Sequence, residues 1–364
     1  MNSRGSAIVH YFFLRSVFSF LFLFSIMMGV FCCFADKTVT DLSDNEVSLP
    51  DSIERIATIE PVGYQFLIIM DEEDKLTGAC TGWANRTLLK KINPIFSKLP
   101  WPGDPNSVNL EELLKENPDL VISKVGYDES SQSMRDIGLD VVEIYPENPE
   151  DLLKSVSLLG KALDKEDKAS DYISYFEKTL SQIREKTEKI SEDDKKRIYL
   201  MGSSPLDTAG SDYYQHYMVT AAGGINVAAD LTGGWNSVSL EEIYSLDPDV
   251  IIMMPYTSTN PEDIAKDPAW QKVDAVKNNQ IYRLPEYIMA YDMPGPESIL
   301  GIMWMATILY PDSVQYDLNE EFKAFYSAFY GLDVTNADID QIITDQSKMQ
   351  NFFEEIPGLG EKIN

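Results

Sequence analysis

The sequence contains few of the residues that enzymes and metal sites most often use. Only three of its 364 residues are cysteine and two are histidine. Cys80 is the only cysteine after residue 35, so the chain beyond that point cannot form an internal disulfide. His216 is the only histidine in the same stretch, which excludes a histidine-rich zinc site. The motifs G-x-S-x-G, G-x-x-x-x-G-K-S/T and C-x-x-C are absent, which argues against the enzyme classes that depend on them.

Positive charge is also scarce. The chain has 30 Lys and Arg against 59 Asp and Glu, a formal net charge of −29. Such a surface repels nucleic acid and anionic lipid head groups, so nucleic acid is excluded as a partner. The apolar content of 44% and charged content of 24% are those of an ordinary globular protein. At this length the chain is expected to build two domains, each with its own core.

Long apolar runs are confined to the N-terminus. Arg4 and Arg15 precede the apolar run Ser16–Phe34, and ordinary polar sequence follows Ala35. This pattern predicts an export signal over residues 1–35 and an extracytoplasmic location, periplasmic or on the cell surface. Three outcomes stay open: cleavage of the segment, its retention as a membrane anchor, or lipidation of one of its two cysteines.

A sixteen-residue segment occurs twice. Ser107–Ile122 reads SVNLEELLKENPDLVI and Ser237–Ile252 reads SVSLEEIYSLDPDVII, with eight identical positions. In each copy Leu-Glu-Glu is expected to open a short amphipathic helix, Pro-Asp to form a turn, and the apolar run to form a buried strand. The two copies are therefore predicted to be equivalent units of two similar lobes, with a ligand between the lobes.

The remaining pattern predicts an α/β fold. Strands alternate with helices, which favours two Rossmann-like lobes with parallel sheets. Apolar residues at helical spacing over 150–190 predict one or two long helices that join the lobes as a spine. The expected organisation is a signal or anchor segment at 1–35, a polar spacer at 36–51, an N-terminal lobe at 52–148, a helical spine at 149–194, a C-terminal lobe at 195–312 and an acidic helical extension at 313–364.

The order of these features resembles one family. The twin segments, the spine, Ala221–Leu231 (AAGGINVAADL) and residues 294–312 (PGPESILGIMWMATILYPD) are similar to the solute-binding proteins of ABC importers for ferric siderophores, haem and cobalamin. The resemblance spans about Arg55–Pro311. It implies a class III periplasmic-binding-protein fold, an iron chelate, haem or corrinoid as ligand with no resident cofactor, an ABC permease with its ATPase as partner, and no enzymatic activity. An extracytoplasmic sensor or a chelatase-like enzyme on the same fold is the alternative.

The resemblance also implies two docking residues. Members of the family place one exposed glutamate on each lobe against arginines of the permease, and the matching positions are Glu111 and Glu241. Charge-assisted bonds between carboxylates and arginines suit this role. The neighbouring Glu112 and Glu242 could share or take this role. The other alternative is that these acids only stabilise the first turn of a helix.

Ligand contacts are expected from loops that follow strands, as in open α/β sheets. Aromatic side chains recur there, and flat rings with polar edges suit a large planar or macrocyclic ligand. The candidate binding residues are Trp83, Arg86, Trp101, Tyr127, Tyr213, Tyr214, His216, Trp235, Tyr256, Tyr287 and Tyr291. Arg283 is a further candidate to hold an acidic group. For any single aromatic residue, core packing is the alternative. His216 is a candidate ligand for the metal of a haem or corrinoid, and a hydrogen-bonded structural role is the alternative; no resident metal site is predicted.

Overall fold

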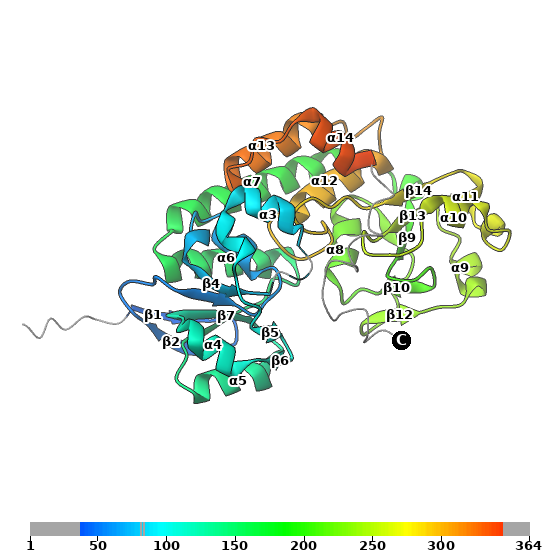
Figure 1. Ribbon diagram of the computed structural model, residues 1–364. Helices are drawn as coiled ribbons and strands as arrows, with labels where there is room; N and C mark the ends of the chain where they lie inside the picture. Colours follow the sequence, from blue (N-terminus) through cyan, green and yellow to red (C-terminus); the bar gives the residue numbers. More distant parts are fainter. Residues whose placement is uncertain (1–36, 81, 83, 345–364) are drawn as a thin grey trace, which may run out of the picture. The chain divides into compact units, whose positions relative to one another are not determined.

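Two four-stranded parallel sheets form the framework of the fold (Figure 1). The computed structural model describes residues 37–80, 82 and 84–344. The first sheet has the order β4-β3-β7-β8, with β3 at Ile56–Thr58, β4 at Leu76–Ala79, β7 at Leu120–Lys124 and β8 at Val141–Ile144. The second has the order β11-β9-β13-β14, with β9 at Arg197–Met201, β11 at Ile225–Asn226, β13 at Val250–Met253 and β14 at Ile281–Arg283. Every pairing within them is parallel, which confirms the predicted α/β class.

The two copies of the repeated segment occupy matching places in the sheets. Helix α4 (Leu110–Glu116) leads into β7, and helix α9 (Leu240–Leu246) leads into β13; each of these strands lies third in the order of its sheet. Both helices end at a residue with left-handed backbone, Asn117 at φ 44° and Asp247 at φ 41°. Asn and Asp tolerate this conformation better than other residues with a side chain.

The Pro-Asp turns after these helices also make matching contacts. Asp119 accepts a hydrogen bond from the backbone N–H of Arg55 at 2.9 Å, and Asp249 accepts one from that of Arg197 at 2.8 Å. The guanidinium groups of Arg55 and Arg197 in turn donate to carbonyl oxygens at the ends of α4 and α9. Each turn thus ties its helix to the start of the neighbouring strand.

Two helices, not one, form the predicted spine. Helix α6 spans Pro149–Leu163 and helix α7 spans Glu166–Thr187, with Asp164 in left-handed backbone between them. At 1.5 Å per residue, the 22 residues of α7 extend about 33 Å. A Cβ on Gly160 would lie 2.6 Å from Cβ of Ala169, so the absence of a side chain lets the helices approach closely.

The segment expected to be a polar spacer is instead part of the fold. Strands β1 (Lys37–Thr40) and β2 (Glu46–Leu49) pair with each other, and Val39, Val47 and Leu49 lie in the main hydrophobic core. Buried Asp41 accepts hydrogen bonds in the turn between them and pairs with Arg135 at 3.3 Å. The prediction was wrong because the acidic composition obscured a short apolar alternation.

The C-terminal extension packs into the core as well. The extension follows helix α12 (Ser298–Leu309), which is largely buried. Its described helices are α13 (Leu318–Tyr330) and α14 (Asn336–Thr344) (Figure 1). The ring centroids of Phe329 on α13 and Tyr172 on α7 are 5.5 Å apart. Helix α12 begins after a turn at 294–297.

Shorter elements complete the described part of the chain. The helices are α2 (Gly63–Ile68), α3 (Arg86–Ile92), α5 (Asp128–Asp136), α8 (Tyr214–Ala221), α10 (Pro261–Lys266) and α11 (Asp274–Lys277), with 3-10 turns at Glu73–Lys75, Pro94–Ser97, Glu192–Asp194 and Trp270–Lys272. Two small antiparallel pairs join β5 (Gly103–Asp104) with β6 (Ser107–Val108) and β10 (Asp207–Ala209) with β12 (Trp235–Ser237). In the described residues, no helix has the length and apolar character needed to cross a membrane.

Candidate ligand-binding and docking residues

Four side chains with ionisable groups gather where strands of the first sheet end. Glu60 follows β3, Lys124 ends β7, Tyr127 follows β7, and Glu147 follows β8. Nζ of Lys124 lies 2.6 Å from Oε1 of Glu147, 3.9 Å from Oε2 of Glu60 and 5.1 Å from the centre of the Tyr127 ring. We call these residues the carboxylate–lysine cluster. The sequence had predicted only Tyr127 for this place.

Burial and neighbouring charges together shift the pKa values in the carboxylate–lysine cluster. Glu60 is 4% exposed, and its burial raises the pKa to about 7 although the charge of Lys124 opposes the rise. Burial alone would lower the pKa of Lys124, but the carboxylates of Glu60 and Glu147 outweigh it and raise that pKa. The pKa of Tyr127 rises to about 12, through burial and the nearby Glu60 charge. Lys124 is therefore charged at neutral pH and is shared between two carboxylates.

Three half-buried rings gather at the corresponding edge of the second sheet. The ring centroids of Tyr213 and Trp235 are 6.0 Å apart, and those of Trp235 and Tyr256 are 6.5 Å apart. Gly202, directly after β9, makes room for them, because a Cβ there would lie 2.6 Å from Cε3 of Trp235. We call Tyr213, Trp235 and Tyr256 the aromatic cluster; the sequence predicted all three as candidate binding residues.

A buried carboxylate supports the aromatic cluster from behind. Oδ2 of Asp292 accepts hydrogen bonds from the Tyr256 hydroxyl at 3.0 Å and from Nε2 of Gln215 at 2.9 Å. Burial raises the pKa of Asp292, and these two donors oppose the rise. Among the described residues, the other carboxylate oxygen, Oδ1, has no hydrogen-bond partner. Sequence reasoning missed Asp292 and Gln215, since one polar residue in an aromatic loop and one in a helix give no recognisable pattern.

Trp101 is a half-buried ring in the first half of the chain. A Cβ on Gly82 would lie 2.5 Å from Cη2 of Trp101, so the ring packs against bare backbone in the segment after β4. Two other candidates from this region, Trp83 and the side chain of Arg86, lie outside the described residues.

Two predicted binding residues belong to the core instead. Tyr214 is 1% exposed and its hydroxyl lies 2.7 Å from Oγ of Ser298; Tyr291 is 0% exposed and its hydroxyl lies 2.8 Å from that of Tyr326. Because neither side chain offers surface to a ligand, both are withdrawn from the candidate set. Tyr291 packs against the C-terminal extension through Phe322 and Tyr326, a contact that the sequence did not reveal.

The remaining candidates, Tyr287, His216 and Arg283, each contact other parts of the protein. Tyr287 is half-buried, with its ring centroid 4.9 Å from that of Tyr326. His216 is half-buried, burial lowers its pKa, and its Nδ1 lies 3.4 Å from Nδ2 of Asn226. The guanidinium of Arg283 donates to the carbonyl oxygens of residues 255, 257 and 259, so it supports a loop and is not a free anion ligand.

The candidate docking glutamates are both exposed, but their surroundings differ. Oε1 of Glu111 pairs with Nζ of Lys115 at 3.2 Å within α4. The matching position in α9 is Ser245, and Glu241 has no ion pair within the described part of the chain. Glu242 closes a capping box with Ser239, so of the two adjacent acids in α9 only Glu241 is available to a partner.

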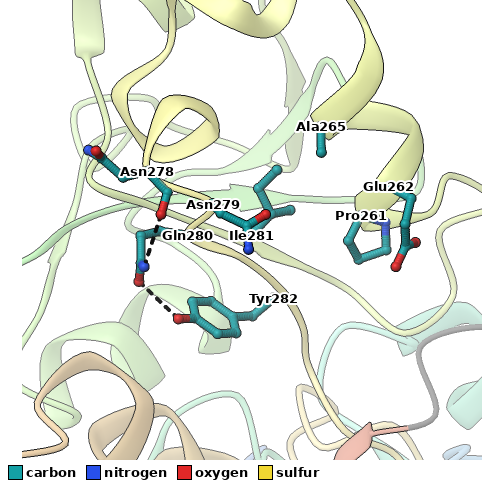
Figure 2. A pocket seen from close by; sticks show the side chains of 8 residues that line it. All are labelled: Pro261, Glu262, Ala265, Asn278, Asn279, Gln280, Ile281 and Tyr282. Atoms are coloured by element: carbon teal, nitrogen blue, oxygen red, sulfur yellow. Dashed lines mark hydrogen bonds between the residues drawn. The ribbon is translucent and has the colours of Figure 1, made fainter.

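A surface pocket of about 440 Å³ lies away from these strand ends (Figure 2). Its lining residues precede or begin β14 or belong to α10: Pro261, Glu262, Ala265, Asn278, Asn279, Gln280, Ile281 and Tyr282. Gln280 already accepts a hydrogen bond from the Tyr282 hydroxyl at 2.9 Å and donates one to the carbonyl oxygen of Asn278 at 3.2 Å. Because the pocket is at the opposite end of β14 from the aromatic cluster, we do not assign the ligand to it.

Two parallel sheets linked by a long helix pair, with aromatic and polar side chains at the strand ends, define a two-part α/β solute-binding protein. The family profile described as "Periplasmic binding protein" matches residues 56–288. The chain therefore belongs to the periplasmic binding protein family, among the solute-binding proteins of ABC importers.

Individual relatives agree with this assignment. The molybdate-binding protein MolA of Haemophilus influenzae is 28% identical over 326 residues, covering 82% of this chain and 92% of its own. A vitamin B12-binding protein of Salmonella choleraesuis is 28% identical over 156 residues, covering 42% of this chain and 56% of its own. A periplasmic solute-binding protein of Veillonella parvula superimposes with a TM-score of 0.76 at 30% identity, covering 84% of this chain and 96% of its own. All three are named as binding proteins.

Proposed function

We propose that this protein captures a metal chelate, which is a ferric siderophore-type complex, haem or a corrinoid, and delivers it to the permease of an ABC importer. The observation that carries the proposal is the aromatic cluster, with Trp101 as a further ring at the strand ends of the other sheet. Half-buried rings with polar edges offer flat, polarisable surface to a large ligand while orienting it by hydrogen bonds.

A free oxyanion fits these residues less well. Such an ion is held by convergent backbone N–H groups and by uncompensated Lys or Arg. Here Lys124 is shared between two carboxylates and Arg283 is bound to three carbonyl oxygens. Molybdate is the ligand in the name of one relative, and vitamin B12 in that of another. The side chains of this protein favour the second kind of ligand.

Delivery requires docking, and we propose that Glu111 and Glu241 perform it. They lie at matching positions in the first turns of α4 and α9, and both are exposed. Two carboxylates presented by two helices can meet two arginine clusters through bidentate bonds. The export segment at 1–35 lies outside the described residues; we propose that it brings the protein across the cytoplasmic membrane, where such a permease is reached.

The visible absorption spectrum tests the ligand class. The protein is incubated separately with ferric hydroxamates, haemin and cobalamin, passed through gel filtration, and its spectrum recorded. Retention of one chromophore in stoichiometric amount is the expected result. If none is retained while molybdate raises the melting temperature, the metal-chelate proposal is wrong and the oxyanion takes its place.

A sensor or a chelatase-like enzyme on this fold is the second candidate function. Turnover separates the classes, because a binding protein returns its ligand unchanged. Chromatography of the ligand after prolonged incubation is expected to recover the intact complex. Loss or insertion of the metal would instead establish an enzyme.

A further inference from the structure

The loop of residues 286–292 determines where one ring of the aromatic cluster lies. At the end of this loop, Asp292 accepts hydrogen bonds from the Tyr256 hydroxyl at 3.0 Å and from Nε2 of Gln215 at 2.9 Å. Tyr256 in turn makes a T-shaped contact with Trp235, with the ring centroids 6.5 Å apart. The shape of the aromatic cluster therefore depends on where the 286–292 loop holds Asp292.

The 286–292 loop has few backbone hydrogen bonds that could fix its position. It contains no helix or strand, only an isolated bridge between Glu286 and Ala290. Instead, the carboxyl group of Glu297 accepts hydrogen bonds from the backbone N–H groups of Ile288 at 3.3 Å and Met289 at 2.9 Å. Buried backbone N–H groups require such partners. Glu297 thus supplies the contacts that a neighbouring strand would supply in a sheet.

Helix α13 of the C-terminal extension contacts both Glu297 and the loop. The Tyr326 hydroxyl donates a hydrogen bond to Oε1 of Glu297 and lies 2.8 Å from the hydroxyl of Tyr291. The ring of Tyr326 also lies against Tyr287, with the centroids 4.9 Å apart. Glu297, Tyr291 and Tyr326 are at most 2% exposed, so bulk water does not replace a bond that is lost. A chain of contacts therefore runs from α13 through Glu297 and the loop to Tyr256.

We propose that Tyr326 is a positioning residue for ligand binding: through Glu297 and the 286–292 loop, it fixes the place of the Tyr256 ring in the aromatic cluster. This inference rests on the proposed function and gives the C-terminal extension a task in it. Tyr326 does not touch the ligand, because its side chain is fully buried. Coupling between two places in a protein is reciprocal, so a ligand at the aromatic cluster is expected to stabilise α13 in return.

Hydrogen exchange in the unmodified protein tests this reciprocity. The protein is compared alone and when saturated with the chelate that it retains, out of ferrioxamine B, haemin and cobalamin. Peptides from the 286–292 loop and from α13 around Tyr326 are expected to exchange more slowly in the complex. Helix α10 is the internal control, because it is at the opposite end of β14 from the aromatic cluster. If exchange in α13 slows no more than exchange in α10, the inference is overturned.

Two variants of α13 separate positioning from stability. Tyr326→Phe keeps the ring and removes the hydroxyl, and the affinity for the retained chelate is expected to fall about threefold to tenfold, as for one misplaced aromatic contact. Tyr330→Phe is the matched control, because the hydroxyl that it removes bonds to Gln65 on α2 at 2.8 Å and not to the loop. It is expected to lower the melting temperature and leave the affinity unchanged.

A double-mutant cycle identifies the route of the effect. Tyr256→Phe removes the bond to Asp292 directly, so adding Tyr326→Phe to it should lower the affinity little further. If the two losses of affinity instead multiplied, Tyr326 would act by another route and the inference would be wrong.

The emission of Trp235 gives a readout that needs no ligand. It is obtained as the difference between each protein and its counterpart with Trp235→Phe. In Tyr326→Phe this emission is expected to move to longer wavelength, because a displaced Tyr256 ring leaves the indole more exposed. In Tyr330→Phe it should not change. An unchanged Trp235 emission in Tyr326→Phe would contradict the inference.

The possible failures are distinguishable. An unchanged affinity in Tyr326→Phe, or an equal loss in Tyr330→Phe, would overturn the inference and leave the proposed function standing. If Tyr326→Phe does not fold, hydrogen exchange in the unmodified protein decides. If none of the three chelates is retained, the proposed function is overturned, and the Trp235 emission still decides whether Tyr326 positions the aromatic cluster.

Discussion

At the scale of single residues, Glu297 is a buried acid with a strongly raised pKa. It is 2% exposed and accepts hydrogen bonds from the backbone N–H groups of Ile288 and Met289 and from the Tyr326 hydroxyl. These donors favour the carboxylate, but burial outweighs them and raises the pKa to about 8. The residue holds together the loop that carries Asp292.

This burial makes stability depend on pH. Because the pKa is about 8 in the folded protein and 4.5 in the reference state, the folded protein holds a proton on Glu297 that the unfolded chain releases. Stability is therefore expected to fall as the pH rises from about 5 to about 8, by at most about 1.4 kcal/mol per pH unit from this group. Glu297→Gln cannot titrate, so its free energy of unfolding relative to the unmodified protein should rise across that range.

Urea unfolding at several pH values measures this difference. Other ionisable groups influence Glu297 or its tyrosine partners, but both proteins contain them, so their own contributions to the pH dependence largely cancel in the difference. These groups are Tyr64, Tyr172, Glu286, Tyr287, Tyr291, Tyr326 and Tyr330. Parallel stability curves for the two proteins would show that Glu297 is ionised throughout.

Gly202 allows a second prediction at this scale. Gly202→Ala places a methyl group 2.6 Å from the Trp235 ring, so the ring must move. We expect a stability loss of about 1–3 kcal/mol, as for other overpacked sites, with a shifted tryptophan emission and weaker chelate binding. Gly78→Ala is the control, because its nearest neighbour would be 3.8 Å away. Unchanged emission in Gly202→Ala would contradict the packing of the aromatic cluster.

At the scale of helices and strands, α4 and α9 differ in the residue that stands beside the proposed docking glutamate. Lys115 pairs with Glu111, whereas Ser245 stands at the matching position beside Glu241. A permease arginine must compete with Lys115 on α4 but not on α9. Exposed pairs of this kind contribute only about 0.3–0.5 kcal/mol, so the competition is weak and docking by both residues is retained.

Charge reversal tests the docking role. The double variant Glu111→Lys, Glu241→Lys is expected to lose at least tenfold of ligand uptake in proteoliposomes that carry the permease and its ATPase, because like charges then face each other. Ligand affinity should not change. Glu241→Lys alone is expected to cost more than Glu111→Lys alone. Glu129→Lys, an exposed reversal on α5, serves as the control. Loss of ligand affinity in the double variant would contradict a pure docking role.

Elements with strong local signals were predicted well from the sequence. The repeated segments showed helical spacing, a turn and an apolar strand within sixteen residues, and the structure confirms both units. The β1–β2 hairpin was missed because its strands are four residues long and the polar residues around them dominate the composition. Asp292 and Gln215, which support the aromatic cluster, were missed for another reason: only the folded chain brings them to Tyr256. Local patterns identified the aromatic residues, and tertiary contacts separated those on the surface from Tyr214 and Tyr291.

At the scale of the whole molecule, the C-terminal extension connects parts that the sequence suggested were separate. On α13, the hydroxyl of Tyr330 donates a hydrogen bond to Oε1 of Gln65 on α2 at 2.8 Å. The ring centroids of Phe325 on α13 and Tyr175 on α7 are 5.7 Å apart. The main hydrophobic core includes buried residues from both sheets and from α13. The described residues from Thr38 onward accordingly form one unit.

A core shared in this way should unfold as one body. Phe325→Ala is expected to lower the free energy of unfolding by about 3–5 kcal/mol, because it leaves a cavity among fully buried rings. Tyr330→Phe should cost less, about 1–3 kcal/mol, since it keeps the ring but leaves the buried Oε1 of Gln65 without its donor. Ile137→Ala, at a position 38% exposed, should stay within about 0.5 kcal/mol. In calorimetry each variant should show one transition that shifts as a whole. If Phe325→Ala instead divided the transition in two, with one part at the original temperature, the halves would have separate cores and α13 would stabilise only one of them.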